Sequence, residues 1–179
     1  MSLPDLYHRP GFLLRRTHQI SAAVFENACA GLGLTPAQYG VLTVLAAEPG
    51  LDQTRLARAL AFDKVTVMRV LKGLEERGLV RRVRSSVSRR QMTVSLTAAG
   101  EEAFAAAREP AERAYQRLLS PLTPDQRQQL IELLQALTNG LADEARAPFV
   151  PLMPKVPAPA PGRTTNGHSG PAGGRRSRG

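Results

Sequence analysis

The sequence contains little cysteine and few aromatic residues. Its 179 residues include a single cysteine, Cys29, and no tryptophan, and aromatic residues make up only 4% of the chain. One cysteine excludes a framework of internal disulfides. With so few aromatic side chains, the core has to consist mainly of Leu, Val and Ala, a composition that favours helices.

Long hydrophobic runs are also missing. No apolar stretch approaches the roughly 18 residues that a membrane span needs. The N-terminal segment MSLPDLYHRPGF lacks the charged start and apolar stretch of a secretory signal. We therefore expect a cytoplasmic protein with no membrane partner.

Catalytic and metal-binding residue types are scarce and scattered. Three histidines and one cysteine offer no nucleophile, base and orienting group close together in the sequence. A zinc site would need clustered ligands, whereas His8, His18 and Cys29 are spread out. We expect neither an enzyme nor a cofactor.

Positive charge, in contrast, is abundant and concentrated. The net charge is +9, and residues 63–96 carry nine basic residues against three acidic ones. Residues 148–179 add five basic residues and no acid, so the rest of the chain is slightly acidic. A basic patch of this kind fits a surface that contacts phosphates.

Composition divides the chain in two. Residues 148–179 contain seven prolines and six glycines. Such a segment buries too little apolar surface to offset the entropy of ordering, which predicts a disordered basic tail. The folded domain is then expected over residues 1–147.

Helix signals occupy the first half of that domain. Apolar periodicity predicts a helix from Pro10 to Leu32, and Thr35-Pro36 opens a second one that stops before Pro49. Asp52 and Asp63 are N-cap residues for two further short helices. A break at 61–62 separates these two, and the second of them ends at Gly78, a suitable C′ residue.

The period then changes from helix to strand. Residues 79–84 and 91–96 read as two strands joined by a loop at 85–90. A helix follows from Thr97, with a kink expected near Pro110. The last helix opens with a capping box at Thr123 and Gln126. Its apolar stripe is formed by Leu130, Leu133, Leu134, Leu137 and Leu141.

This order of elements predicts a mainly α fold with a small β-hairpin wing. Two short helices with a tight turn, followed by a basic hairpin, form a winged helix-turn-helix, and long helices from both chain ends supply a dimerisation region. The leucine stripe and the apolar face of the first helix have too little partner surface within one chain. We therefore expect a homodimer.

The helix from Asp63 to Gly78 carries a mixed outward face. On a helical wheel Val67, Val70, Leu71 and Leu74 share the core side. The major groove of DNA suits such a mixed face. A cation can bind guanine, a hydroxyl can bond to a base edge, and small apolar groups can contact thymine methyls. The candidates for DNA contact on this helix are Lys64, Val65, Thr66, Arg69 and Lys72.

The hairpin is the second candidate for DNA contact. An arginine on a thin loop can enter a narrow minor groove, where the negative potential is strongest. We expect the arginine cluster to have no acidic residue nearby, an arrangement that a polyanionic partner would stabilise. The candidates for DNA contact here are Arg82, Arg84, Arg89 and Arg90, with Arg81 beside them.

Several of these segments resemble the MarR family of bacterial regulators. The resemblance rests on DKVT at 63–66, LEERGLVRR at 74–82 and VSLTAAG at 94–100, and it covers about residues 10–145. It implies a homodimer with recognition helices in successive major grooves of a pseudo-palindromic operator and wings in the minor groove. The family usually represses transcription until a small ligand binds. Ser88 departs from the Asp that family wings usually carry.

The stretch HRPGFLLRRTHQI is similar to family members that control the breakdown of aromatic acids. In that family effectors bind between the dimerisation helices and the DNA-binding lobe. An arginine with an aromatic slot suits a small aromatic carboxylate or an aromatic acyl thioester. The candidate ligand residues are His8, Phe12, Arg16, His18 and Tyr39, with Arg9 and Arg15 nearby.

Two alternatives remain open for the function. A thiol-based redox sensor would use Cys29, although a lone cysteine on an apolar helix is usually a packing residue. The winged helix could also serve only as a protein-interaction module. Salt-sensitive binding to duplex DNA would distinguish that module from a transcriptional regulator.

Overall fold

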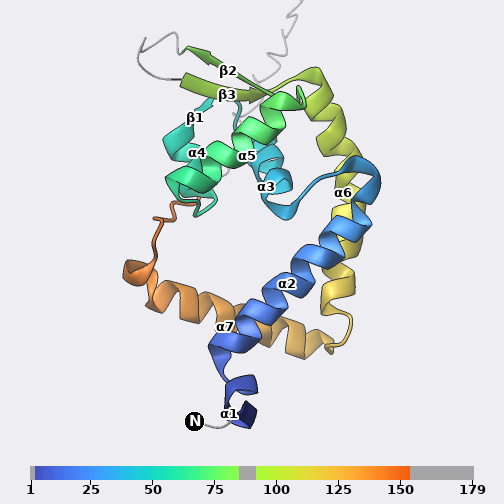
Figure 1. Cartoon of the computed structure of the whole chain (residues 1–179), viewed down its shortest axis with the longest axis vertical. Coiled ribbons are helices and arrows are strands. Elements are labelled where there is room, and N and C mark those ends of the chain that lie inside the picture. Colours follow the sequence, from blue (N-terminus) through green and yellow to red (C-terminus); the bar gives the residue numbers. More distant parts are fainter. Residues whose placement is uncertain (1–2, 85–91, 154–179) are drawn as a thin grey trace, which may run out of the picture.

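A computed structural model of the chain describes residues 3–84 and 92–153. Its elements, labelled in Figure 1, follow in this order: α1 (Leu3–Tyr7), α2 (Pro10–Ala28), the 3-10 helix η1 (Ala30–Leu32), α3 (Pro36–Ala47), β1 (Leu51–Asp52), α4 (Gln53–Ala59), α5 (Lys64–Glu76), β2 (Val80–Arg84), β3 (Met92–Leu96), α6 (Ala98–Leu119), α7 (Pro124–Gly140) and the 3-10 helix η2 (Ala142–Glu144). The sheet, α3, α4 and α5 form one lobe, from which α2, α6 and α7 extend.

The lobe has a closed apolar core. Leu42 of α3, Leu56 of α4, Leu71 of α5 and Val94 of β3 are fully buried. Burying such a side chain stabilises the fold by roughly 1.5–3 kcal/mol. This shared core fixes the orientation of α5 on α3 and α4. The same cluster includes Leu34, Val41, Leu45, Leu51, Val67, Val70, Leu74, Leu79, Val80 and Ala107.

Both short helices of the lobe begin at the predicted N-caps. The Asp52 carboxylate accepts two backbone N–H bonds of 2.9 Å at the start of α4. The Asp63 carboxylate accepts the Thr66 N–H at 2.7 Å at the start of α5. Between them Ala61 has a positive φ of 51°, which marks the tight turn of a helix-turn-helix.

The sheet contains the predicted hairpin and one further short strand. β2 and β3 pair antiparallel, with Val80 opposite Leu96 and Arg84 opposite Met92. β1 adds to the other side of β3, where Leu51 lies opposite Val94. β1 was not predicted, because a strand of two residues shows no detectable alternation of apolar and polar side chains.

The joint between the sheet and α6 explains the glycines of this region. Gly78 has a positive φ of 69° after α5, as expected for a C′ residue. The Thr97 hydroxyl donates to the Gly78 carbonyl at 2.6 Å and accepts the Gly100 N–H at 3.1 Å, which caps α6. A Cβ at Gly100 would lie 2.0 Å from the Leu79 carbonyl oxygen, so no larger residue fits there.

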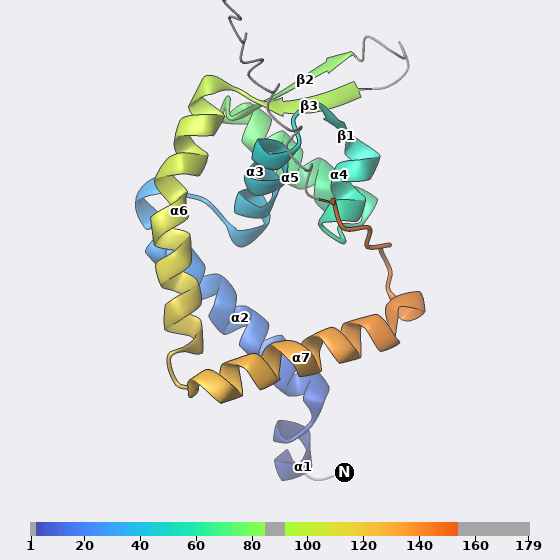
Figure 2. The same cartoon turned by 180° about the vertical axis from the view of Figure 1, so that it is seen from behind.

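The long helices α2 and α6 lie side by side in both Figure 1 and Figure 2. Phe25 and Cys29 from the end of α2 pack against Ala111 and Ala114 of α6 in a second, smaller core. Pro110, where a kink was expected, lies inside α6, which is one continuous helix from Ala98 to Leu119.

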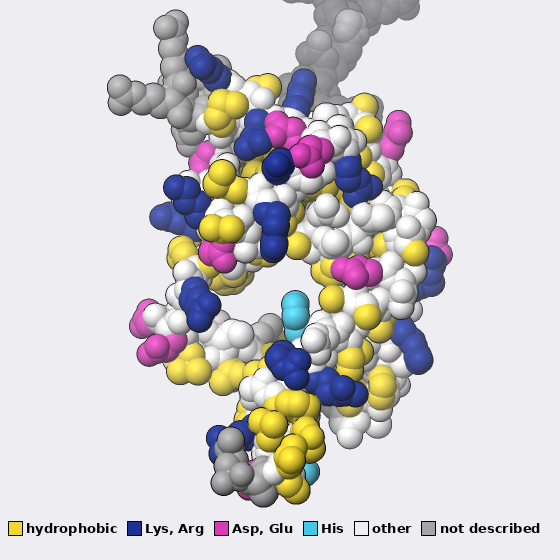
Figure 3. Space-filling view, viewed as in Figure 1, with side chains coloured by type: hydrophobic (Ala, Val, Ile, Leu, Met, Phe, Trp, Pro, Cys, Tyr) yellow, Lys and Arg dark blue, Asp and Glu magenta, His cyan; other side chains and the backbone are white. Residues whose placement is uncertain are grey.

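Helix α7 begins with the predicted capping box at Thr123 and Gln126. It has no buried residue, and Leu133 and Leu141 of its leucine stripe are 62% and 56% exposed. Figure 3 shows an opening through the protomer between α7, α2 and the lobe. The described residues of one protomer therefore leave this apolar stripe largely uncovered.

The chain returns from α7 to the lobe. We call residues 145–153 the C-terminal strap. Ala147 is buried, the Val150 N–H donates to the Arg58 carbonyl at 3.0 Å, and Leu152 packs against the lobe core. The predicted tail starts at residue 148, so the strap includes its first six residues, of which Val150 bonds to α4 and Leu152 packs against the lobe core. Residues 154–179 lie outside the described part of the chain.

The N-terminal helices differ from the expectation. The helix predicted over 10–32 ends at Ala28, and a 3-10 turn follows. Cys29 leaves helical geometry, and Gly33 has a positive φ of 57°, which ends the turn. The short helix α1 was not predicted, because five residues show no clear period.

Candidate nucleic-acid interface

Helix α5 presents the outward face that its pattern predicts. Val67, Val70, Leu71 and Leu74 are buried in the lobe. On the opposite side Val65 is 76% exposed. The remaining exposed side chains of this face belong to Lys64, Met68, Arg69 and Lys72. The face combines cations and apolar groups, as major-groove readout requires.

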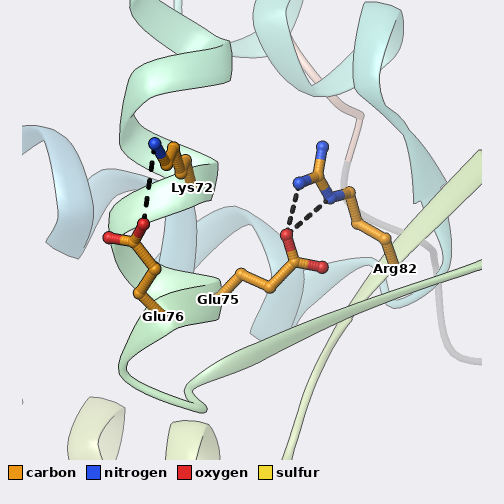
Figure 4. A network of polar contacts seen from close by, with 4 residues as sticks. All are labelled: Lys72, Glu75, Glu76 and Arg82. Carbon is orange, nitrogen blue, oxygen red and sulfur yellow. Dashed lines mark hydrogen bonds and ion pairs between the residues drawn. The ribbon is translucent and has the colours of Figure 1, made fainter.

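Lys72 has only a weak partner within the protein. Its Nζ lies 3.7 Å from a carboxylate oxygen of Glu76, and both side chains are largely exposed (Figure 4). Exposed pairs of this kind contribute about 0–1 kcal/mol. Lys72 can therefore exchange this contact for a phosphate at little cost.

Thr66, predicted to contact a base, is partly occupied by the N-cap of α5. Its hydroxyl donates to the second oxygen of the Asp63 carboxylate at 3.1 Å. Hydrogen bonds from Thr66 lower the pKa of Asp63. The hydroxyl oxygen retains acceptor capacity, so a contact with an amino group of a base is still compatible with the cap.

Arg82 is held by an acidic residue, contrary to the expectation of an arginine cluster without one. Its Nε donates to Glu75 at 3.0 Å, and its Nη2 donates to the same oxygen (Figure 4). The hydrogen bond with Arg82 lowers the pKa of Glu75 and raises that of Arg82. The expectation was wrong because Glu75, at the end of α5, faces the hairpin across the helix–strand joint.

The other predicted wing residues separate into two groups. Arg81 and Arg84 are exposed on β2, and Arg84 lies at the end of the strand, opposite Met92. Ser88, Arg89 and Arg90 lie outside the described residues. Figure 3 shows Lys and Arg side chains gathered over the lobe.

A cavity of about 620 Å³ adjoins the first turn of α5. Its walls come from α4, α5, β3 and the C-terminal strap, and they include Arg58, Asp63, Lys64 and Arg146. The strap therefore lies close to the end of α5 that carries the predicted DNA contacts.

Of the predicted ligand residues on the N-terminal part of the chain, Phe12 lies in a small cluster with Tyr7 and Arg15. The rings of Tyr7 and Phe12 meet edge to face, with centroids 5.3 Å apart. The Arg15 guanidinium lies 5.3 Å from the centroid of the Phe12 ring. His8 bonds to the Pro4 carbonyl through Nδ1 at 2.9 Å. Arg16 and His18 are exposed.

Tyr39 belongs to a different cluster. Its ring centroid lies 5.5 Å from that of Phe25 and 5.8 Å from that of Phe104. Arg16 precedes Phe25 by nine residues on α2, about 13.5 Å along a helix axis. The sequence-based prediction placed Tyr39 and Arg16 in one ligand site. Within one protomer, the two residues are therefore not adjacent, contrary to that prediction. The cavity of about 620 Å³ includes neither residue.

Cys29 lies in the small core between α2 and α6. It is 1% exposed, and burial raises the pKa of its thiol. Reactive cysteines are exposed and have a lowered pKa. These surroundings fit a packing residue.

Arg77, the C-cap residue of α5, was not among the predicted site residues. Its guanidinium donates to the carbonyls of Gly33 at 2.8 Å and Leu32 at 2.7 Å. These atoms belong to the turn after α2, so Arg77 connects α5 to that turn. The partners are backbone atoms distant in sequence, and no local pattern indicates them.

The described residues, 3–84 and 92–153, offer neither a membrane-spanning helix nor a metal-binding cluster. No helix there is long and apolar enough to cross a membrane. No group of three or more His, Cys, Asp or Glu residues there could hold a metal ion.

Comparisons with known proteins identify the family. Residues 32–91 match the model of the MarR family. The chain is 35% identical over 128 residues to the putative transcriptional regulatory protein for the hcr operon of Thauera aromatica, covering 71% of this chain and 77% of that protein.

Two solved structures extend this likeness. The transcriptional repressor CouR bound to a 23-mer DNA duplex matches with a TM-score of 0.69 and 33% identity, over 77% of this chain and 98% of CouR. Bordetella bronchiseptica BpsR, whose DNA binding is regulated by 6-hydroxynicotinic acid, matches with a TM-score of 0.70 and 28% identity, over 74% and 95% of the two chains. The relatives are regulators and not enzymes, and the chain belongs to the MarR family of winged helix-turn-helix, DNA-binding transcriptional regulators.

Proposed function

We propose that this protein is a homodimeric repressor that binds a pseudo-palindromic operator and leaves it when a small aromatic carboxylate or an aromatic acyl thioester binds. The observation that carries the proposal is the outward face of α5. A closed lobe holds this face rigidly, and it combines the exposed cations Arg69 and Lys72 with the exposed apolar Val65.

The proposed dimer is supported by what one protomer leaves uncovered. The leucine stripe of α7 is exposed, and so are Leu13, Leu14 and Ile20 of α2. Packing these faces across a two-fold axis would bury both. The same axis would present two copies of α5 to major grooves about 34 Å apart, which is why the operator is expected to be pseudo-palindromic.

The effector class rests on chemistry of the chain and on relatives. Arg15 beside Phe12, and Tyr39 beside Phe25, offer cations and rings for an aromatic acid. A solved structure of CouR holds p-coumaroyl-CoA, an aromatic acyl thioester. BpsR responds to 6-hydroxynicotinic acid, a pyridine carboxylate. Because the two clusters are separate within one protomer, a pocket using both requires the dimer.

Release of DNA needs only modest coupling. A ligand acts only if it binds the released state better than the DNA-bound state. A tenfold loss of DNA affinity corresponds to about 1.4 kcal/mol, within the usual range for allostery. Movement of each lobe by a few ångströms would break the match to successive grooves without unfolding any element.

The DNA-binding part is tested with two arginine variants. We expect Arg90→Ala to weaken operator binding strongly and to lower the salt dependence by about one charge per chain. Arg175→Ala, in the tail, removes the same charge and should have a much smaller effect at the specific site. Equal effects would contradict the role of the wing, and no salt-sensitive binding to any duplex would favour the protein-interaction module.

The effector part is tested by titrating the protein–DNA complex with a panel of hydroxybenzoates, pyridine carboxylates and aromatic acyl thioesters in a gel-shift assay. We expect one class to release the wild type, and Arg16→Ala or Tyr39→Ala to abolish release while DNA binding persists. Tyr39→Phe keeps the ring in its cluster and isolates the phenol. A different outcome would favour the redox sensor: peroxide releases the wild type from DNA but does not release Cys29→Ser, and no aromatic acid releases the wild type.

A further inference from the structure

Arg77 makes the hydrogen bonds that tie the end of α5 to the η1 turn, which follows the first long helix α2. Its two terminal nitrogens donate to two successive carbonyls, those of Leu32 and Gly33, at 2.7 and 2.8 Å. A planar guanidinium can serve both acceptors at once, whereas the ammonium of lysine is a single point of charge. We call this contact the Arg77 clamp.

The clamp has a clear local cause. The Gly33 N–H turns back to the Cys29 and Ala30 carbonyls, which closes the η1 turn. The next carbonyls, of Leu32 and Gly33, then have no N–H from the continuing helix to accept. Such carbonyls at a helix end favour a cation. Arg77, at the end of α5, supplies this cation.

The clamp lies at the end of α5 that is remote from its N-cap. α5 has 13 residues, so it is about 20 Å long. A tilt of about 10° around the clamped end would move the first turn by about 3.5 Å. That shift equals about one base-pair step of duplex DNA. Small changes at Arg77 are therefore amplified where Lys64 and Val65 lie.

The partner of the clamp leads directly to the dimerisation region. The η1 turn continues α2, whose Leu13, Leu14 and Ile20 are exposed for the proposed dimer interface. Figure 1 shows α2 leaving the lobe as one long rod. The clamp therefore joins the element that sets the position of the two-fold axis to the element that enters DNA.

We infer that Arg77 is a positioning residue that sets the operator half-site spacing accepted by the dimer. The inference rests on the proposed function, because it takes α5 as the helix that enters the major groove. In the dimer each clamp fixes the angle of one α5 relative to α2, and the two angles together fix the separation of the two reading surfaces. Without the clamp each lobe adjusts its angle independently.

The test uses a palindromic duplex selected with the wild-type protein from a random library. Matched duplexes insert or delete one base pair between the half-sites, which changes their separation by about 3.4 Å and their relative rotation by about 35°. Affinity is measured for wild type, Arg77→Gln and Arg77→Lys. Arg108→Gln, which removes an exposed arginine from α6, is the matched control.

We expect wild type and Arg108→Gln to lose about tenfold or more in affinity for each altered spacing. Arg77→Gln should bind the selected duplex about five- to tenfold more weakly than wild type, because its lobes become ordered only on binding. Relative to its own affinity for the selected duplex, the variant should lose less than about threefold on the altered duplexes. Arg77→Lys should fall between them. The salt dependence of Arg77→Gln should match wild type, since Arg77 positions the helix without contacting phosphate.

Contrary outcomes are distinguishable. If wild type binds duplex and Arg77→Gln keeps its steep spacing dependence, the inference is overturned and the proposed function stands. A salt dependence lowered by one charge per chain would make Arg77 a phosphate contact and also overturn it. If wild type binds no duplex, both fall. Circular dichroism and light scattering establish that the variants are folded dimers, and Arg77→Lys still decides the question if Arg77→Gln does not fold.

Discussion

The lobe and the long helices solve the burial problem in different ways. In the lobe, side chains such as Leu71 are completely buried by elements of the same chain. In α7 no residue is buried, and Leu137 of its stripe is 46% exposed. The lobe has a closed core, whereas α7 and the outer part of α2 leave apolar side chains uncovered within the described residues of one protomer.

This difference matches a division of labour. A reading surface must be rigid before DNA arrives, so its supporting core is closed within one chain. In the proposed dimer, the spacing between two reading surfaces is a property of the pair, so it would depend on faces that one chain leaves open. Substitutions in the two regions should therefore fail in different ways.

The largest contrast comes from one substitution made in both places. Leu71→Ala removes a fully buried side chain and should lower the free energy of unfolding by about 2–5 kcal/mol. Leu137→Ala should weaken the dimer, so its effect on stability should grow as the protein is diluted. Urea unfolding at two protein concentrations, with light scattering, measures both effects. A loss at Leu137 that is independent of concentration would show that the stripe packs within the protomer.

A smaller contrast uses the two threonine caps. The Thr97 side chain caps α6 and also bonds to the Gly78 carbonyl, so it ties α6 to the sheet. Thr97→Ala should cost about 1–2 kcal/mol of stability. Thr123 caps α7 alone. Thr123→Ala should cost less, about 0.5–1 kcal/mol, in the same urea titration. An equal cost would mean that the tie to the sheet adds nothing.

The smallest effect concerns pH. Arg82 lowers the folded-state pKa of Glu75, so this ion pair stabilises the lobe above the unfolded pKa of about 4.3 and is lost as pH falls through the lower folded value. Glu75→Gln should flatten the loss of stability below about pH 4. Arg82→Gln should flatten it equally. If the stability of Glu75→Gln fell with pH as steeply as that of the wild type, the ion pair would not contribute to acid unfolding.

Local signals predicted the lobe well. Asp52, Asp63 and Thr97 act at short range, so their caps can be read from neighbouring residues. The buried face of α5 follows from a period of 3.6 residues. The family itself was identified from segments within the lobe and its exit into α6.

Contacts between distant segments were beyond the reach of such patterns. Glu75 and Arg82 meet because a turn reverses the chain, and Arg77 meets backbone atoms that carry no residue signature. Arg16 and Tyr39 have suitable chemistry for one site, but the length of α2 separates them in the protomer. Residue type predicted what each group could do, and only the fold showed which groups could do it together.

The C-terminal strap also affects the order in which the protein is completed during synthesis. The Arg58 carbonyl that accepts the Val150 N–H belongs to α4, which leaves the ribosome long before residue 150. All the buried residues of the lobe core have been made once Ala107 has been added, so most of the lobe can fold while α7 is still being synthesised. The strap then docks last. A nascent chain could close its core, and present α5, before it has the α7 helix for pairing with a second copy.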